Sequence, residues 1–185
     1  MRVLLAVVLL WLPFAAVAAK QVSFATVYEH DGEYTVEIDA VLNASQAELR
    51  RLLTDYNHLT RLNDVLIESA LLATHDAHHH KTRMTAQRCV AMICFKAVLV
   101  ENATELVNGD LESVIVPAES DFRAGVTRWH FEPLPGNQTR AYFESIKIPA
   151  FFIPPIIGTS IMKKLMMDES LGAMDRLEAL AGHGP

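Results

Sequence analysis

The chain has 185 residues, of which 51% are hydrophobic and 21% are charged, and its net charge is −6. This length and composition are typical of a single folded domain and exclude a disordered or low-complexity chain. The excess of acidic residues argues against a nucleic-acid partner, because contacts to phosphates require a basic surface.

The first residues are typical of a secretory signal peptide. Met1-Arg2 precedes the apolar stretch Val3–Val17, and Ala16-Val-Ala18 is a small-x-small cleavage pattern. A transmembrane anchor is the alternative, but the stretch is shorter than the roughly 20 residues needed to cross a bilayer. We therefore predict a signal peptide over residues 1–19, a single domain over residues 20–185 and export to the bacterial periplasm. The mature chain would carry a net charge of −7, which disfavours general attraction to anionic membranes.

The next region predicts a strand followed by a helix. Apolar and polar residues alternate from Ser23 to Leu42, as in a half-buried strand, and Asp31-Gly32 is a hairpin signal. Ser45-Gln-Ala-Glu48 is a capping box, which predicts the start of a helix. This helix is expected to continue, with a break, through Leu62.

Six further strand-like runs and a long helix complete the chain. Turn residues separate the runs, so an antiparallel meander is expected. The runs cover roughly residues 64–73, 81–89, 94–106, 111–117, 125–133 and 139–148. After Ile148, a helix rich in Met and Leu is predicted to end near Ala181 and to lie on the inner face of the meander.

This order of elements resembles the START-like, or SRPBCC, superfamily with its helix-grip fold. Three local segments are also similar to exported bacterial members: Asp55–Asn63, Ser120–Trp129 and Phe152-Ile-Pro-Pro155. The resemblance covers about residues 24–181. It implies an α+β fold in which a curved antiparallel sheet of about seven strands surrounds a long C-terminal helix. Carriers, sensors and polyketide cyclase/dehydrase enzymes share this fold, so the resemblance leaves the function open.

The two cysteines, Cys89 and Cys94, are expected to form a disulfide in an oxidising compartment. In one straight strand they would lie about 16 Å apart, whereas a disulfide needs Cα atoms within roughly 7 Å. Pairing therefore requires the chain to reverse between them, and the helix-grip order needs that extra turn. Two reduced, buried cysteines within a strand are the alternative.

The turns of an up-and-down meander gather at two ends of the sheet. One end collects the mostly polar turns His75–His80, Asn108–Asp110 and Leu134–Gln138, and the other collects apolar turns around Val90–Ile93 and Ala150–Pro155. We predict that the apolar end is the mouth of an internal pocket. The expected lining or rim residues are Met92, Phe122, Trp129, Tyr142, Phe151, Phe152, Ile153, Met162 and Met166.

The expected ligand is a hydrophobic small molecule or lipid, such as a quinone, isoprenoid, fatty acid or phospholipid. Transient contact with a membrane surface is a further hypothesis, since several cations are expected near the mouth: Lys96, Arg123, Lys147, Lys163 and Lys164. Alternatively, Phe151 and Phe152 fold inward as core.

No sequence motif indicates catalysis or a cofactor. Gly-rich phosphate loops, Gly-x-Ser-x-Gly and His-Glu-x-x-His are absent, so a carrier is favoured over an enzyme and no cofactor is expected. Glu144, if it pointed inward, would be a candidate base of a cyclase/dehydrase-type enzyme. His78 and His80 are candidate metal ligands, with a solvated loop as the alternative. A protein-interaction module without a cavity is the remaining hypothesis.

Overall fold

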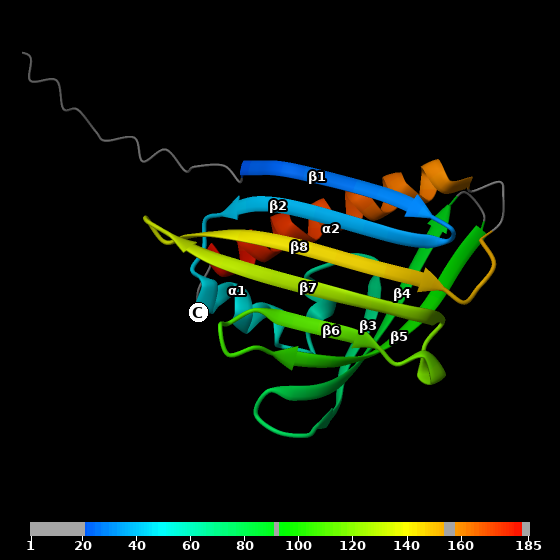
Figure 1. Cartoon of the computed structure of the whole chain (residues 1–185), viewed down its shortest axis with the longest axis horizontal. Helices are drawn as coiled ribbons and strands as arrows, with labels where there is room; N and C mark the ends of the chain where they lie inside the picture. Colours follow the sequence, from blue (N-terminus) through cyan, green and yellow to red (C-terminus); the bar gives the residue numbers. More distant parts are fainter. Residues whose placement is uncertain (1–20, 91–92, 154–157, 183–185) are drawn as a thin grey trace, which may run out of the picture.

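The computed structural model describes residues 21–90, 93–153 and 158–182. The predicted signal peptide, Met92 and residues 154–157 lie outside these ranges. The described residues form one antiparallel sheet with helices on one of its faces (Figure 1). The strands are β1 (Gln21–His30), β2 (Glu33–Leu42), β3 (Leu66–Thr74), β4 (His79–Val90), β5 (Ile93–Glu105), β6 (Leu111–Ile115), β7 (Phe122–Leu134) and β8 (Gln138–Pro149). The helices are α1 (Gln46–Leu53) and α2 (Gly158–Gly182), with short 3-10 turns η1 (Leu59–Arg61) and η2 (Pro117–Glu119).

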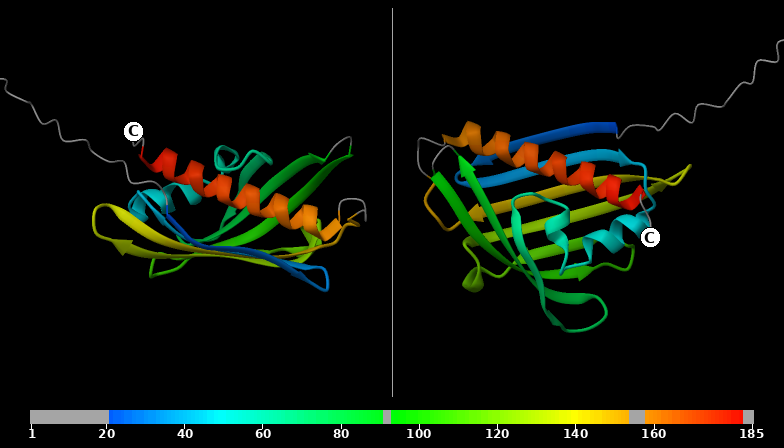
Figure 2. Two further views of the ribbon diagram at one scale, coloured as in Figure 1. Left: turned by 90° about the horizontal axis from the view of Figure 1, so that it is seen from above. Right: turned by 180° about the vertical axis from the view of Figure 1, so that it is seen from behind.

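The sheet has eight strands in the order β1-β2-β8-β7-β6-β5-β4-β3. It is curved, and α2 lies across its concave face (Figure 2). The predicted α+β helix-grip architecture is therefore confirmed. The sheet has one strand more than expected because the residues before Asp31-Gly32 pair with β2 as a strand of their own.

Local turn and cap chemistry explains where the first elements begin and end. Asp31 and Gly32 have φ angles of 51° and 82°, which the tight β1–β2 hairpin requires. Ser45 is the N-cap of α1, and its hydroxyl and the Glu48 carboxylate complete the predicted capping box. The predicted break in the helix is also confirmed, because η1 follows α1 after a short gap.

The solid part of the core lies where α1 and the C-terminal half of α2 meet β2. Leu49 of α1, Leu42 of β2 and Leu177 of α2 are at most 1% exposed. Met174 and Ala181 of α2 belong to the same buried cluster. Burial of these side chains anchors one end of α2 on the sheet.

The β4–β5 hairpin reverses the chain between the two cysteines, as predicted. Cys89 lies directly opposite Cys94 in the strand register, with 3.9 Å between their Cα atoms, and the two form a disulfide. The alternative of two reduced cysteines is therefore wrong. The disulfide covalently joins the two strands at the end of the hairpin.

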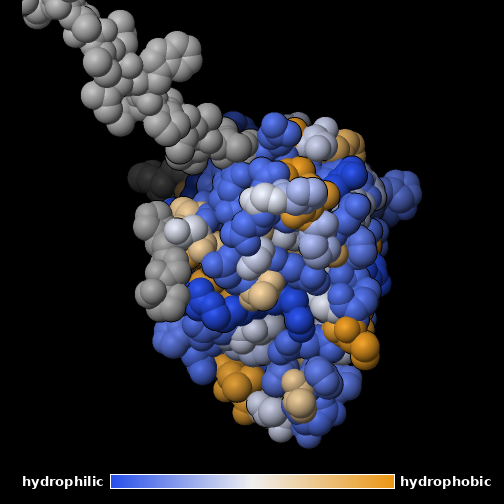
Figure 3. Space-filling view, turned by 90° about the vertical axis from the view of Figure 1, so that its left-hand side faces the viewer, coloured by the Kyte–Doolittle hydropathy of each residue, from blue (hydrophilic) through white to orange (hydrophobic). Residues whose placement is uncertain are grey.

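The surface at one end of the sheet can be compared with the predicted polar end. The end that carries the β5–β6 and β7–β8 turns has a mostly hydrophilic surface, interrupted by small separate apolar areas (Figure 3). No helix among the described residues is long and apolar enough to cross a membrane.

Candidate ligand-binding site

Two cavities lie between the concave face of the sheet and α2. The inner cavity has a volume of about 270 Å³ and lies beside α1 and η1, with Leu53, Tyr56, Leu62, Leu99, Trp129 and Met174 among its lining residues. The mouth cavity has a volume of about 280 Å³ and lies under the N-terminal half of α2, with Val36, Phe95, Ala97, Phe151, Met162 and Met166 among its lining residues.

The two cavities adjoin one another. Phe143 of β8 and Ser170 of α2 line both of them. Together the cavities reach the range of about 300–1,000 Å³ that is typical of small-molecule pockets. A protein-interaction module with a solid interior therefore does not fit the described structure.

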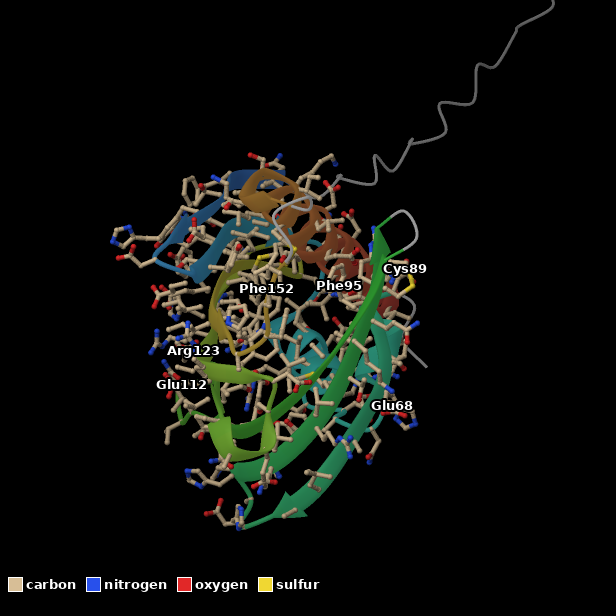
Figure 4. The ribbon with its side chains drawn as sticks, turned by 90° about the vertical axis from the view of Figure 1, so that its right-hand side faces the viewer. Glu68, Cys89, Phe95, Glu112, Arg123 and Phe152 are labelled. Atoms are coloured by element: carbon tan, nitrogen blue, oxygen red, sulfur yellow. A yellow bond between two sulfur atoms is a disulfide. The ribbon has the colours of Figure 1, made fainter. Side chains whose placement is uncertain are left out.

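The apolar residues that follow β8 gather at the mouth cavity. Phe151 and Ile153 line it, and the Phe151 ring packs edge-on against Phe122 of β7 with centroids 5.7 Å apart. Phe152, in contrast, is 76% exposed. Figure 4 looks at this end of the molecule and labels Phe95, which lines the mouth cavity, and Phe152. The alternative in which both Phe151 and Phe152 fold inward is thus wrong for Phe152.

A buried ion pair lies on the concave face of the sheet. Lys147 Nζ of β8 lies 2.6 Å from Glu101 Oε1 of β5, and the two side chains are only 11% and 5% exposed. Lys147 also donates a hydrogen bond of 3.0 Å to Thr127 Oγ1, which lies 3.3 Å from Ser145 Oγ. Lys147, Glu101 and Thr127 line the inner cavity, and Ser145 lines the mouth cavity. This polar cluster therefore lies where the two cavities meet.

Gly125 of β7 makes room for the Lys147 side chain. Gly125 is paired with Lys147 in the register of β7 and β8. A Cβ atom at position 125 would lie 2.8 Å from Lys147 Cδ and 2.7 Å from the backbone oxygen of Ile146. The absence of a side chain at Gly125 thus allows Lys147 to cross β7 toward Glu101.

The position of Lys147 corrects the sequence-based expectation that it meets lipid head groups at the rim. Its side chain points into the interior because it shares strand parity with the inward Phe143 and Ser145. Glu101 was not among the residues predicted from the sequence. The available signal was its parity with the cavity-lining residues Leu99 and Ala103 of the same strand.

Tyr142 and Glu144 lie on the convex face of the sheet, so Tyr142 does not line the cavities as expected, and the condition for a catalytic Glu144, an inward side chain, is not met. Glu144 Oε2 accepts a 2.7 Å hydrogen bond from Arg128, which also binds Glu112. Tyr142 is 38% exposed, and its hydroxyl donates to Glu37 Oε1 at 3.3 Å. Strand parity correctly placed both residues on one face of β8, but parity does not tell which face becomes concave.

The histidine-rich turn between β3 and β4 is organised around Asp76. This carboxylate accepts hydrogen bonds from the backbone N–H of His78 and contacts the His79 ring. These hydrogen bonds lower the pKa of Asp76 to about 2. His80 instead packs against the Tyr56 ring and lies 3.5 Å from Glu105. Among the described residues, no group of three or more His, Cys, Asp or Glu side chains could hold a metal ion.

One ion pair joins two walls of the mouth cavity. Arg88 of β4 lies 2.7 Å from Glu169 of α2, and both residues line the cavity. Arg176 of α2 and Asp64, which precedes β3, form a second pair nearby. These pairs join α2 to the β3–β4 side of the sheet, and they could not be predicted from the sequence because the partners lie far apart in the chain.

These features define the class of fold: the chain has the START-like helix-grip fold. Three solved structures illustrate it. The Zhui aromatase/cyclase from a Streptomyces species is 10% identical with a TM-score of 0.65, covering 81% of this chain and 94% of that chain. A START superfamily protein from Mycobacterium smegmatis is 14% identical with a TM-score of 0.64, covering 80% and 97%. A STAR-related lipid transfer protein from Xanthomonas axonopodis is 12% identical with a TM-score of 0.62, covering 86% and 99%.

At these identities the likeness concerns the fold alone. No protein-family profile matches the sequence, and no curated protein matches it. The function must therefore be argued from the cavities and their lining.

Proposed function

We propose that this protein binds a hydrophobic small molecule or lipid in the two adjoining cavities and carries it in the bacterial periplasm. The observation that carries the proposal is the apolar space between the sheet and the N-terminal half of α2. A ligand that enters this space gains about 25 cal/mol for each Å² of apolar surface removed from water. One protein of the same fold is named as a STAR-related lipid transfer protein, which supports a ligand of this kind.

Filling the mouth cavity tests the proposal. Ala97 lines this cavity, so Ala97→Phe should occupy the space and weaken binding of the apolar fluorescent probe phenylnaphthylamine about tenfold or more. Ala118→Phe is the matched control, because Ala118 is exposed on η2. Equal probe affinity in wild type and both variants would contradict binding in this cavity.

Extraction of the purified protein identifies the natural ligand. We expect organic extraction followed by mass spectrometry to release a hydrophobic molecule from the wild type and much less of it from Ala97→Phe. Recovery of equal amounts from both proteins would mean that the molecule binds elsewhere on the surface.

Export is part of the proposal and rests on the N-terminal sequence, with the Cys89–Cys94 disulfide as a supporting observation. The expected result is a periplasmic protein whose N-terminus begins after Ala18 or Ala19. Cell fractionation with N-terminal sequencing measures both properties. A cytoplasmic protein that retains Met1 would contradict this part alone.

Contact of the mouth with a membrane surface is the proposed route of ligand exchange. Phe152 is 76% exposed beside the mouth cavity, where an aromatic side chain could enter a lipid surface. Phe152→Asp should slow transfer of phenylnaphthylamine between the protein and phospholipid vesicles. Val107→Asp is the control, because Val107 is fully exposed in the β5–β6 turn at the opposite end. Equal slowing by both variants, or by neither, would exclude a specific role for the mouth.

A cyclase/dehydrase-type enzyme is a second candidate function. The observation in its favour is that two titratable groups, Lys147 and Glu101, line the inner cavity. An enzyme would convert the extracted ligand during incubation, whereas a carrier would return it unchanged. Mass spectrometry of the ligand before and after incubation with the protein distinguishes the two.

A further inference from the structure

We infer that the ligand has an uncharged polar end, a hydroxyl or carbonyl group, which binds at the Lys147–Glu101 pair. This inference rests on the proposed function and narrows its ligand class. Long-chain alcohols, isoprenoid alcohols and quinones belong to this class, and ionised fatty acids do not. The argument depends on the hydrogen bonds of the polar cluster and on the charges around the cavities.

The cluster offers both a donor and an acceptor to a ligand. An ammonium group has three N–H donors, and Lys147 uses two of them for Glu101 Oε1 and Thr127 Oγ1. Lys147 reaches Oε1 of Glu101, and no described residue donates a hydrogen bond to its Oε2 atom. A ligand hydroxyl can accept from Lys147 and donate to Glu101, while a carbonyl can accept from Lys147.

The charge of the cluster disfavours an anionic ligand. Lys147 and Glu101 neutralise one another in a site where both side chains are nearly buried. A carboxylate that approached Lys147 would compete with Glu101 and would leave two negative charges against one positive charge away from water. Burial of such an unbalanced charge is strongly unfavourable.

The other cation in the described cavity lining does not make the site more favourable for an anionic ligand. Among the described residues that line either cavity, the only other cation is Arg88, and it is paired with Glu169. Glu112 also lines the inner cavity and is paired with Arg128 on the convex side. A ligand anion would therefore find no unpaired cation in this lining.

The cluster also lies at a suitable position for a polar end. Lys147 and Thr127 line the inner cavity and Ser145 lines the mouth cavity, so the polar group lies between two apolar spaces. A molecule bound there can place apolar parts in either space while its oxygen reaches Lys147.

Four ligands with the same apolar chain test the inference: dodecanol, dodecanoate, dodecylamine and dodecane. Each is used to displace phenylnaphthylamine from the wild-type full chain at neutral pH. We expect dodecanol to bind about tenfold or more tightly than dodecane, because a hydrogen bond to a charged group is worth that factor in affinity. Dodecanoate and dodecylamine should both bind more weakly than dodecanol.

Replacing the pair should remove the preference. In Lys147→Met/Glu101→Met, dodecanol and dodecane should bind within about twofold of one another. Lys81→Met/Glu119→Met is the matched control, because Lys81 and Glu119 also form a 2.6 Å ion pair but lie outside both cavities. This control should keep the preference of the wild type.

The outcomes separate this inference from the proposed function. Binding of all four ligands with equal affinity, or tightest binding of dodecanoate, would overturn the neutral polar end while leaving a hydrophobic carrier in place. Displacement by none of them would overturn both. The comparison of ligands uses the wild type, so it holds even if the double variant does not fold.

Discussion

The two halves of helix α2 use similar residues for different purposes. In the C-terminal half, Leu177 and Ala181 are at most 2% exposed and belong to the buried cluster with α1 and the sheet. In the N-terminal half, Met162 and Met166 lie over the mouth cavity, and Ile161 is 41% exposed. The difference arises because α1 fills the concave face under only one half of the helix. One apolar helix can therefore both complete a core and cover a binding space.

The largest effect on stability is expected at the buried Lys147–Glu101 pair, which lies on the sheet where the two cavities meet. Lys147→Met would leave the Glu101 carboxylate buried without its partner, which is expected to lower the free energy of unfolding by about 3–5 kcal/mol. Lys147→Met/Glu101→Met should recover most of this loss, since it removes both charges. Urea unfolding of the two variants measures the difference. Equal stability of the single and double variants would show that the pair is effectively solvated.

The comparison of the two halves predicts a smaller but clear difference in stability. Leu177→Ala should lower the free energy of unfolding by about 2–4 kcal/mol, because it opens a void in a packed region. Met162→Ala should lower it by less than about 1 kcal/mol, because Met162 already faces a cavity. Urea unfolding monitored by circular dichroism tests both. The reverse order of the two losses would contradict the division of α2 into a packed half and a covering half.

The disulfide at the open end should have the smallest effect on stability. Cys89→Ser/Cys94→Ser removes a crosslink that closes a short loop, for which loop-closure entropy predicts a loss of about 2 kcal/mol. Arg88 and Phe95 are next to the cysteines in the chain and line the mouth cavity. Loss of the disulfide should therefore also speed the release of phenylnaphthylamine from this variant. Stopped-flow release from the variant and from Leu177→Ala separates this local effect from general destabilisation. Equal release rates in the two variants would show that the hairpin has no specific role in retaining the ligand.

Much of the fold could be predicted from the sequence because its signals are local. Asp31-Gly32 has the chemistry that a tight hairpin needs, and Ser45 with Glu48 has that of a helix start. The period of two in each strand correctly grouped Tyr142 with Glu144 on one face. The Cys89–Cys94 disulfide followed once the number of strands required a reversal between the cysteines.

The candidate site was less predictable because it depends on contacts between distant strands. Glu101 and Lys147 lie on β5 and β8, and no pattern within either strand relates one to the other. No feature of the sequence predicted a role for Gly125, although its missing side chain allows Lys147 to reach Glu101. Trp129, Phe151, Ile153, Met162 and Met166 line the cavities, whereas Tyr142 lies outside them.

By itself, the sequence determined the elements, their order and which residues share a face, since these follow from short-range backbone and side-chain chemistry. Only the tertiary structure decided which face is concave, that α2 packs at one end and covers a space at the other, and that Lys147 meets Glu101 inside. The physical reason is that sheet curvature and helix docking result from all strand pairings together, so no single segment of the chain contains them.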